Sequence, residues 1–97
     1  MTAAGTAEAE KIARKAVEKE LAVCVNIVPK VRSSYRWQGE VEEASEVLML
    51  FKTTHKAWPK LKKRIRKWHS YDVPEILKLS IEEGDEEYLK WISHNVG

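Results

Sequence analysis

A single long β-hairpin is the feature of this sequence that most limits the folds it can adopt. Residues 23–28 are an almost continuous run of β-branched and small apolar side chains, typical of a strand covered on both faces or paired at a subunit contact. Pro29 predicts a bend or bulge, after which aromatic and polar residues alternate up to residue 37. Residues 38–40 (Gln-Gly-Glu) predict the turn, and residues 41–53 predict the return strand.

This hairpin is too long for one small core to cover, because strands average about five or six residues. The chain has 97 residues, of which 43% are hydrophobic, which suits a single domain over residues 1–97 with one modest core. An uncovered flat strand promotes aggregation, so the outer hairpin needs another surface to pair with. We expect that surface to be a second copy of the chain.

A helix is predicted on each side of the hairpin. Residues 6–20 form the first, with Thr6 as its N-cap and one apolar stripe at steps of three and four residues: Ala9, Ile12, Ala13, Ala16, Val17 and Leu21. Pro59 predicts the first turn of the second helix. One face of this second helix carries Trp58, Leu61, Ile65 and Trp68.

The C-terminal third predicts one more strand and one more helix. Residues 73–81 alternate in polarity, which indicates a strand, and Pro74 confines its first residues to a sheet edge. Asp85 is the expected N-cap of a final helix, with Leu89, Ile92 and Val96 facing inward. Only residues 1–5 are available for a leading strand.

The order of these elements predicts an α+β fold of the ferredoxin-like type, a split βαβ sandwich with helices on one face of an antiparallel sheet. The long hairpin, the shortened first strand and the additional C-terminal helix are departures from the simplest form of that fold.

Composition excludes several classes of protein. Cys24 is the only cysteine, so the disulfide framework of a small secreted domain is absent and a reducing compartment fits best. The chain has no signal-peptide pattern and no apolar stretch long enough to cross a bilayer. We therefore expect a cytoplasmic protein without a membrane partner. The net charge of +2 does not by itself require a nucleic-acid partner.

Several sequence motifs resemble those of the CutA divalent-cation-tolerance family and occur in the same order along the chain. The first is Ala22-Val23-Cys24-Val25-Asn26-Ile27-Val28-Pro29, followed by residues 33–43 (SSYRWQGEVEE). Residues 45–50 (SEVLML), Lys52-Thr53, residues 69–76 (HSYDVPEI) and residues 88–91 (YLKW) match in the same order. The resemblance covers nearly the whole chain from about Ala7 onward.

The resemblance implies a ferredoxin-like subunit in a homotrimer similar to the PII-type signalling proteins, with long hairpins pairing across subunits. It also implies a role in tolerance of divalent cations, especially copper. Two departures stand out. The family corner His-Pro-Tyr-Glu is replaced by residues 69–72 (HSYD), and the leading strand is short. Either the fold accepts a short first strand or the natural gene product extends upstream of Met1.

Cys24, His69 and Glu75 are the candidate metal ligands. A thiolate is a soft ligand suited to Cu(I), and imidazole also binds copper well. Because no Cys-x-x-Cys, His-x-x-x-His or Glu-x-x-His pair occurs, a metal site would have to be assembled in space, for example between subunits. The simpler interpretation is structural: a lone cysteine in a strand is usually a buried hydrophobe, and a histidine at a helix C-terminus is favoured by the helix dipole.

Five family-motif residues are candidates for an intersubunit cleft resembling the effector pocket of PII-type proteins: Tyr35, Trp37, Lys52, Tyr71 and Tyr88. Tyrosine and tryptophan are also enriched at interfaces for packing alone, which is the interpretation we favour. A small-molecule sensor and a structural docking trimer therefore stay open as alternatives to a metal response.

The basic run at residues 60–67 could bind the phosphates of a nucleic acid, with Trp58 and Trp68 stacking on bases. We expect instead a solvated helix face with both tryptophans packed inward, so nucleic acid is a minor alternative. Catalysis by His69 with Tyr71 or Lys52 is a further alternative. Because no nucleophile elbow or phosphate-binding loop occurs, we do not expect an enzyme.

Overall fold

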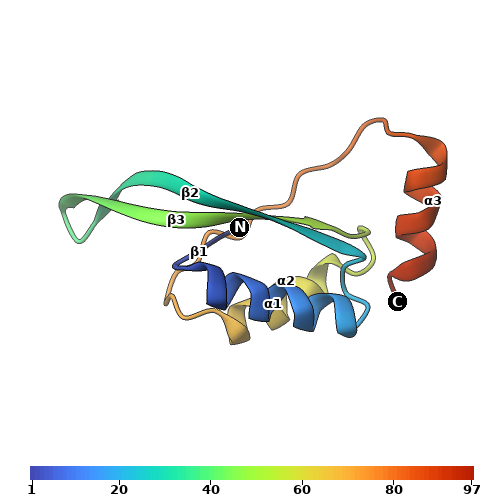
Figure 1. Ribbon diagram of the computed structural model, residues 1–97, viewed down its shortest axis with the longest axis horizontal. Helices are drawn as coiled ribbons and strands as arrows, with labels where there is room; N and C mark the ends of the chain where they lie inside the picture. Colours follow the sequence, from blue (N-terminus) through green and yellow to red (C-terminus); the bar gives the residue numbers. More distant parts are fainter.

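The fold consists of a three-stranded antiparallel sheet with two helices packed on one face and a third helix at one end (Figure 1). The computed structural model describes all residues from 1 to 97. The strand order is β1-β3-β2. The elements in chain order are β1 (Thr2–Ala3), α1 (Thr6–Glu18), β2 (Cys24–Trp37), β3 (Glu40–Lys52), α2 (Trp58–Trp68) and α3 (Glu86–Asn95). The predicted α+β class is confirmed.

The long hairpin is confirmed and extends well beyond the helices (Figure 1). Its register runs from the pair Cys24–Lys52 to the pair Trp37–Glu40. The expected bulge follows Pro29, where the register shifts between Val28 and Val31 and Lys30 has a φ of 63°. At the tip Gln38 and Gly39 have φ angles of 50° and 81°, the left-handed conformation that a tight two-residue hairpin turn requires.

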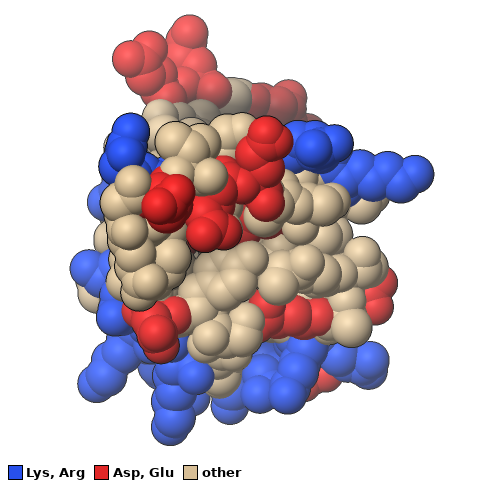
Figure 2. All heavy atoms as spheres, turned by 90° about the vertical axis from the view of Figure 1, so that its left-hand side faces the viewer, with Lys and Arg blue, Asp and Glu red and all other residues tan.

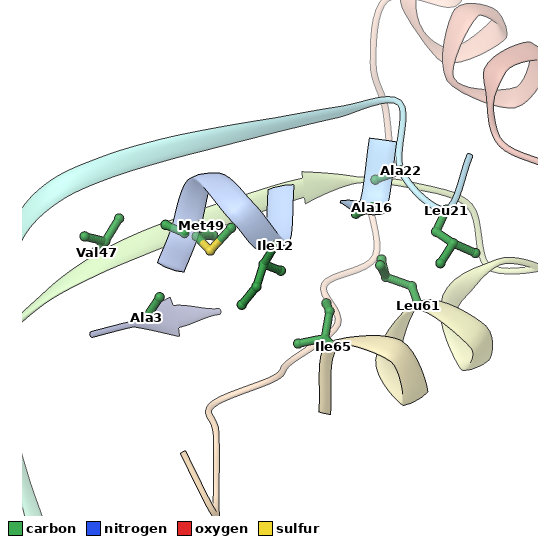
Figure 3. Close-up of a cluster of buried hydrophobic side chains, with 10 residues drawn as sticks. Ala3, Ile12, Ala16, Leu21, Ala22, Val47, Met49, Leu61 and Ile65 are labelled. Atoms are coloured by element: carbon green, nitrogen blue, oxygen red, sulfur yellow. The ribbon is translucent and has the colours of Figure 1, made fainter. Parts of the chain in front are cut away.

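The hydrophobic core lies between the sheet and helices α1 and α2 (Figure 3). Its largest fully buried side chains are Ile12 of α1, Met49 of β3, and Leu61 and Ile65 of α2. The predicted stripe of α1 holds for Ala9, Ile12 and Ala16, which are buried. Val17 is an exception, with 41% of its surface exposed.

Of the two predicted N-caps, one is confirmed and one is wrong. Thr6 is not the N-cap of α1, because Gly5 holds that position in extended backbone without a side-chain hydrogen bond. Helix α1 also ends at Glu18, two residues earlier than expected. The cap of α3 is confirmed: the Asp85 carboxylate accepts a 3.1 Å hydrogen bond from the backbone N–H of Tyr88. Within α3 Ile92 is buried, whereas Leu89 is exposed.

The strand expected over residues 73–81 does not form, and these residues run as irregular backbone from the sheet toward α3 (Figure 1). A strand needs a neighbour to accept its ladder of hydrogen bonds. β1 pairs with β3 through two residues only, so it offers almost no free edge for a further strand. Only Ile76 of this run packs against the core, and the alternating apolar side chains Val73, Leu77, Leu79 and Ile81 are exposed.

No helix in the chain combines the length and the hydropathy needed to cross a membrane.

Candidate functional site

The corner that follows α2 is held by the ring of His69, which is buried. The ring nitrogen Nε2 lies 2.7 Å from the carbonyl oxygen of Thr2, and Nδ1 lies 3.0 Å from the backbone nitrogen of Tyr71. A carbonyl can only accept and a backbone N–H can only donate. His69 is therefore the neutral tautomer with its proton on Nε2, and both ring nitrogens are occupied within the chain.

Tyr71 continues this network into the sheet. Its hydroxyl donates a 2.8 Å hydrogen bond to the buried carboxylate of Glu46 in β3, and its ring centroid lies 4.7 Å from that of His69. Burial, followed by the hydrogen bond to Glu46 and the charge of that carboxylate, raises the pKa of Tyr71 to about 12. The phenol therefore stays protonated at neutral pH and serves as a hydrogen-bond donor to Glu46.

Glu8 of α1 attaches the same corner to the helical layer. Its carboxylate accepts hydrogen bonds from the backbone N–H of Ser70, at 2.8 Å, and of Ala4, at 3.3 Å. Partial burial raises the pKa of Glu8, but the hydrogen bonds from Ser70 and Ala4 and the nearby His69 together outweigh it, so the pKa lies below its ordinary value. Glu8 is thus ionised at neutral pH.

The three candidate metal ligands do not meet within one chain, and no cluster of three or more histidine, cysteine or acidic side chains in it could hold a metal ion. Cys24 is half-buried and lies opposite Lys52 at the start of the hairpin. The His69 ring lies beside Thr2, and Thr2 pairs with Leu48 of β3. Leu48 is four residues from Lys52 along β3, which places the His69 ring about 13 Å from Lys52. Glu75 is exposed on the irregular segment.

The donor set of a single chain therefore does not fit a bound metal. Coordination at Nε2 of His69 would also remove the proton that bonds to Thr2.

The five residues considered for a cleft are likewise spread over the molecule. Trp37 is at the hairpin tip, whereas Lys52 is at its base, about 40 Å away at the usual rise per strand residue. Lys52 donates hydrogen bonds to the Asn26 side chain and the Leu50 carbonyl, and Tyr88 packs beside Trp91 on α3. Tyr35 and Tyr71 lie near enough for the charge of Tyr35 to raise the pKa of Tyr71. One chain therefore does not form a cleft from these five residues.

A shallow pocket of about 280 Å³ lies instead where the base of the hairpin faces α3. This pocket was not among the sites predicted from the sequence, although the polar residues 53–55 directly after a strand were a signal for it. It also missed Glu46, whose signal was an acidic residue placed directly before five apolar ones. The pocket is lined by Thr53, Thr54, His55, Trp58, Lys78, Leu79, Ser80, Ile81, Leu89, Ile92 and Ser93.

Comparison with known proteins gives one consistent result. The family described as CutA1 divalent ion tolerance protein matches residues 1–95. The divalent-cation tolerance protein CutA of Thermus thermophilus is 56% identical over 92% of this chain and 86% of its own length. Mouse protein CutA is 46% identical over 87% of this chain, but the match covers only 48% of the mouse protein, so this chain spans about half the length of that relative.

Solved structures agree with this match. The structure of the divalent cation tolerance protein from Thermus thermophilus superposes with a TM-score of 0.96 at 53% identity, covering 99% of this chain and 93% of that one. The structure named as the periplasmic divalent cation tolerance protein CutA of Archaeoglobus fulgidus superposes equally well, with a TM-score of 0.96 at 40% identity and the same two coverages. Both resemblances extend over the hairpin, the helices and the segment between them.

Proposed function

Because this chain belongs to the CutA1 divalent ion tolerance family, we propose that it works as a homotrimer that binds or senses divalent cations, copper in particular, without catalysing a reaction. The reducing compartment that suits its single cysteine makes the cytoplasm the proposed location, although one similar protein is named periplasmic. The observation that most strongly supports a trimer is that the outer half of the hairpin is uncovered.

The hairpin supports self-association in two ways. Beyond the bulge neither strand of the hairpin is covered by a helix (Figure 1). The surface of this outer hairpin nevertheless includes Tyr35, Trp37 and Val41, and Val41 is 70% exposed. A flat, exposed strand pair with apolar side chains is stabilised when it pairs with another sheet. The exposed apolar side chains of residues 73–81 give such a partner a second surface to cover, since Leu79 is 85% exposed.

A metal site between subunits is the form of cation binding that suits this chain. The thiol of Cys24 is the soft donor for Cu(I), and Glu75 is an exposed carboxylate with no hydrogen bond that would have to be broken. His69 supports the corner structurally, with its ring nitrogens bonded to Thr2 and Tyr71. A small-molecule effector bound between subunits is the alternative that a failure of metal binding would favour.

The trimer is tested by light scattering after gel filtration. We expect a mass about three times that of the 11.2 kDa subunit. The double variant Trp37→Glu/Val41→Glu places charge on the outer hairpin and should give a smaller species. Glu42→Gln, on the same part of the hairpin, is the matched control and should leave the mass unchanged. A wild-type protein that is a monomer at micromolar concentration contradicts the proposal.

Metal binding is tested by calorimetric titration with Cu(I) under reducing conditions and with Cu(II). Tight binding at a fixed number of ions per trimer, lost in Cys24→Ala while the trimer persists, supports the proposed site. Glu75→Gln should weaken binding, whereas Glu83→Gln, which also removes one exposed carboxylate, should not. Weak binding that no variant alters contradicts direct metal binding and directs the search to a small-molecule effector.

A further inference from the structure

Positive charge is concentrated on the helical layer. Figure 2 shows Lys and Arg side chains along the lower side of the molecule, where α1 and α2 lie in Figure 1, and acidic side chains mostly above them. The other ten basic residues of the chain are outnumbered by its fifteen acidic ones. We call the basic helix face the seven cationic residues of α2 and the turn before it, a segment without acidic residues: Lys56, Lys60, Lys62, Lys63, Arg64, Arg66 and Lys67.

These charges are not neutralised within the protein. The two ion pairs of the chain are Arg14–Glu18 and Lys90–Glu86, so every cation of the basic helix face lacks a carboxylate partner. Like charges four residues apart, such as Lys62 and Arg66, repel each other and destabilise a helix. The helix dipole favours cations only at the C-terminal end of α2. Helix stability therefore does not explain the charge of this face.

Two aromatic rings lie at the ends of the basic helix face. Trp68 packs against the hydrophobic core as expected from the sequence, but part of its surface and part of that of Trp58 remain exposed. Trp58 and Trp68 are both partly buried and are separated by about 15 Å along the helix axis. The amine of Lys62 lies 5.8 Å from the ring centroid of Trp58, and that of Lys15 lies 5.5 Å from that of Trp68. Each ring thus has a lysine amine close to it.

A hollow of about 320 Å³ opens beside Trp68, between α1 and α2. Its rim carries two cations of α1, Lys11 and Lys15, and the carboxylate of Glu8, which is engaged by Ser70 and Ala4. The hollow combines an aromatic wall with cationic side chains at its edge. That combination suits a flat, uncharged ring attached to an anionic group.

We propose that the basic helix face, together with Lys11 and Lys15 of α1, binds single-stranded nucleic acid, with backbone phosphates on the lysine and arginine side chains and a base against Trp68. Stacking on aromatic side chains beside a cationic track is the usual means of binding single strands without sequence preference. The partly exposed rings with lysine amines beside them, and the unpaired charges, are what favour this function over the merely solvated face expected from the sequence. The proposal is independent of any metal response.

The geometry favours a single strand over the other polyanions. A lipid surface would be entered by the apolar face of α2, but Leu61 and Ile65 of that face are each only 1% exposed. A stacked duplex would offer phosphates to the lysines but no free base for Trp68. Leu61 and Ile65 of α2 are buried in the core, so the charged residues of the same helix face away from the sheet. Pairing of hairpins between subunits therefore leaves the basic helix face accessible.

The test is fluorescence anisotropy of labelled 12-mer single strands, dT and rU, titrated with the full chain between 50 and 200 mM salt. For about four phosphate contacts, the logarithm of the affinity should fall with the logarithm of the salt concentration with a slope of about −3. Tryptophan fluorescence should be quenched on binding. In Trp68→Leu the quenching should weaken while the salt slope persists, and Trp68→Phe should retain most of the affinity.

Charge-reversal variants show where the strand lies. Lys62→Glu/Lys63→Glu/Lys67→Glu should weaken binding by about tenfold or more and reduce the salt slope by about two. The matched control is Lys19→Glu/Lys78→Glu/Lys90→Glu, which has the same net charge but leaves the basic helix face intact, and it should bind almost as wild type. Circular dichroism and the oligomeric mass establish that each variant is folded.

Three results would overturn the proposal. The first is no saturable binding at 50 mM salt. The second is equal loss in both triple variants, which would make net charge the cause. The third is binding of a 12-base-pair duplex, or of vesicles containing phosphatidylserine, that is as tight as that of the single strands and leaves tryptophan fluorescence unchanged.

Discussion

The hydroxyl of Tyr71 donates a 2.8 Å hydrogen bond to the carboxylate of Glu46, joining the corner after α2 to the middle of β3. Glu46 is buried, with 8% of its surface exposed, and Tyr71 is the hydrogen-bond donor to its side chain. A buried carboxylate without a donor is costly, so this contact fixes the position of the corner relative to the sheet.

The Tyr71–Glu46 bond makes stability depend on pH in the alkaline range. The pKa of Tyr71, raised to about 12 from 10.0, means that its stabilising effect is complete below pH 10 and is lost as the pH rises toward 12. Tyr71→Phe should lower the free energy of unfolding at pH 7 by about 1–3 kcal/mol. The difference from wild type, measured by denaturant unfolding, should shrink above pH 10. Tyr88→Phe is the control, and an equal effect there would contradict this assignment.

Glu8 makes stability depend on pH in the acid range. Its pKa lies below the ordinary value of 4.5, so its contribution is present above that pH and is lost as the pH falls through the lower, folded-state pKa. Because its partners are exposed, the contribution should be below about 1 kcal/mol. Glu8→Gln should lower the melting temperature at pH 7 but not at pH 3. Glu10→Gln, on the exposed side of α1, should have no such pH-dependent effect.

The two hydrogen bonds of the His69 ring assign its proton to Nε2. The ¹⁵N shifts of its ring should show a protonated Nε2 and an unprotonated Nδ1. His69→Ala removes both hydrogen bonds of the ring and should cost about 1–3 kcal/mol, because the Thr2 carbonyl loses its donor. A ring with its proton on Nδ1 would contradict the geometry described here.

The hairpin tip should respond in opposite directions to substitutions at its two turn positions. Gly39 has a φ of 81°, so Gly39→Ala should destabilise the protein by about 1–2 kcal/mol through backbone strain, even though a Cβ there meets no neighbouring atom. Gln38→Asn should be neutral or stabilising, since asparagine accepts the left-handed conformation more readily. Thermal unfolding measures both, and stabilisation by Gly39→Ala would contradict the turn geometry.

Much of the secondary structure could be predicted because its signals are local. The alternation along β2 and β3, the bulge after Pro29 and the Asp85 cap each depend on residues a few positions apart. Thr6 was wrong as a cap because the helix begins at Thr6 itself, and Gly5 takes the N-cap position. A shift of one residue in a helix start is below what such local signals resolve.

The corner network could not be predicted. The sequence singled out His69 and Tyr71 as candidate site residues, but their hydrogen-bond partners are the Thr2 carbonyl and Glu46 of β3, 67 and 25 positions away. The exposure of Trp68 depends in the same way on α1, whose Lys15 lies over the ring. These contacts exist only after the helices have packed on the sheet.

The sequence by itself determined the three helices and the long hairpin, which family the chain resembles, and that this hairpin is longer than one core can cover, because hydrophobic period and turn chemistry act over a few residues. Tertiary structure alone decided that residues 73–81 stay irregular, that His69 is neutral and fully bonded, and that Cys24, His69 and Glu75 remain apart. The physical reason is that a strand, a buried polar group and a metal ion each need partners, and the partners come from residues distant in the chain.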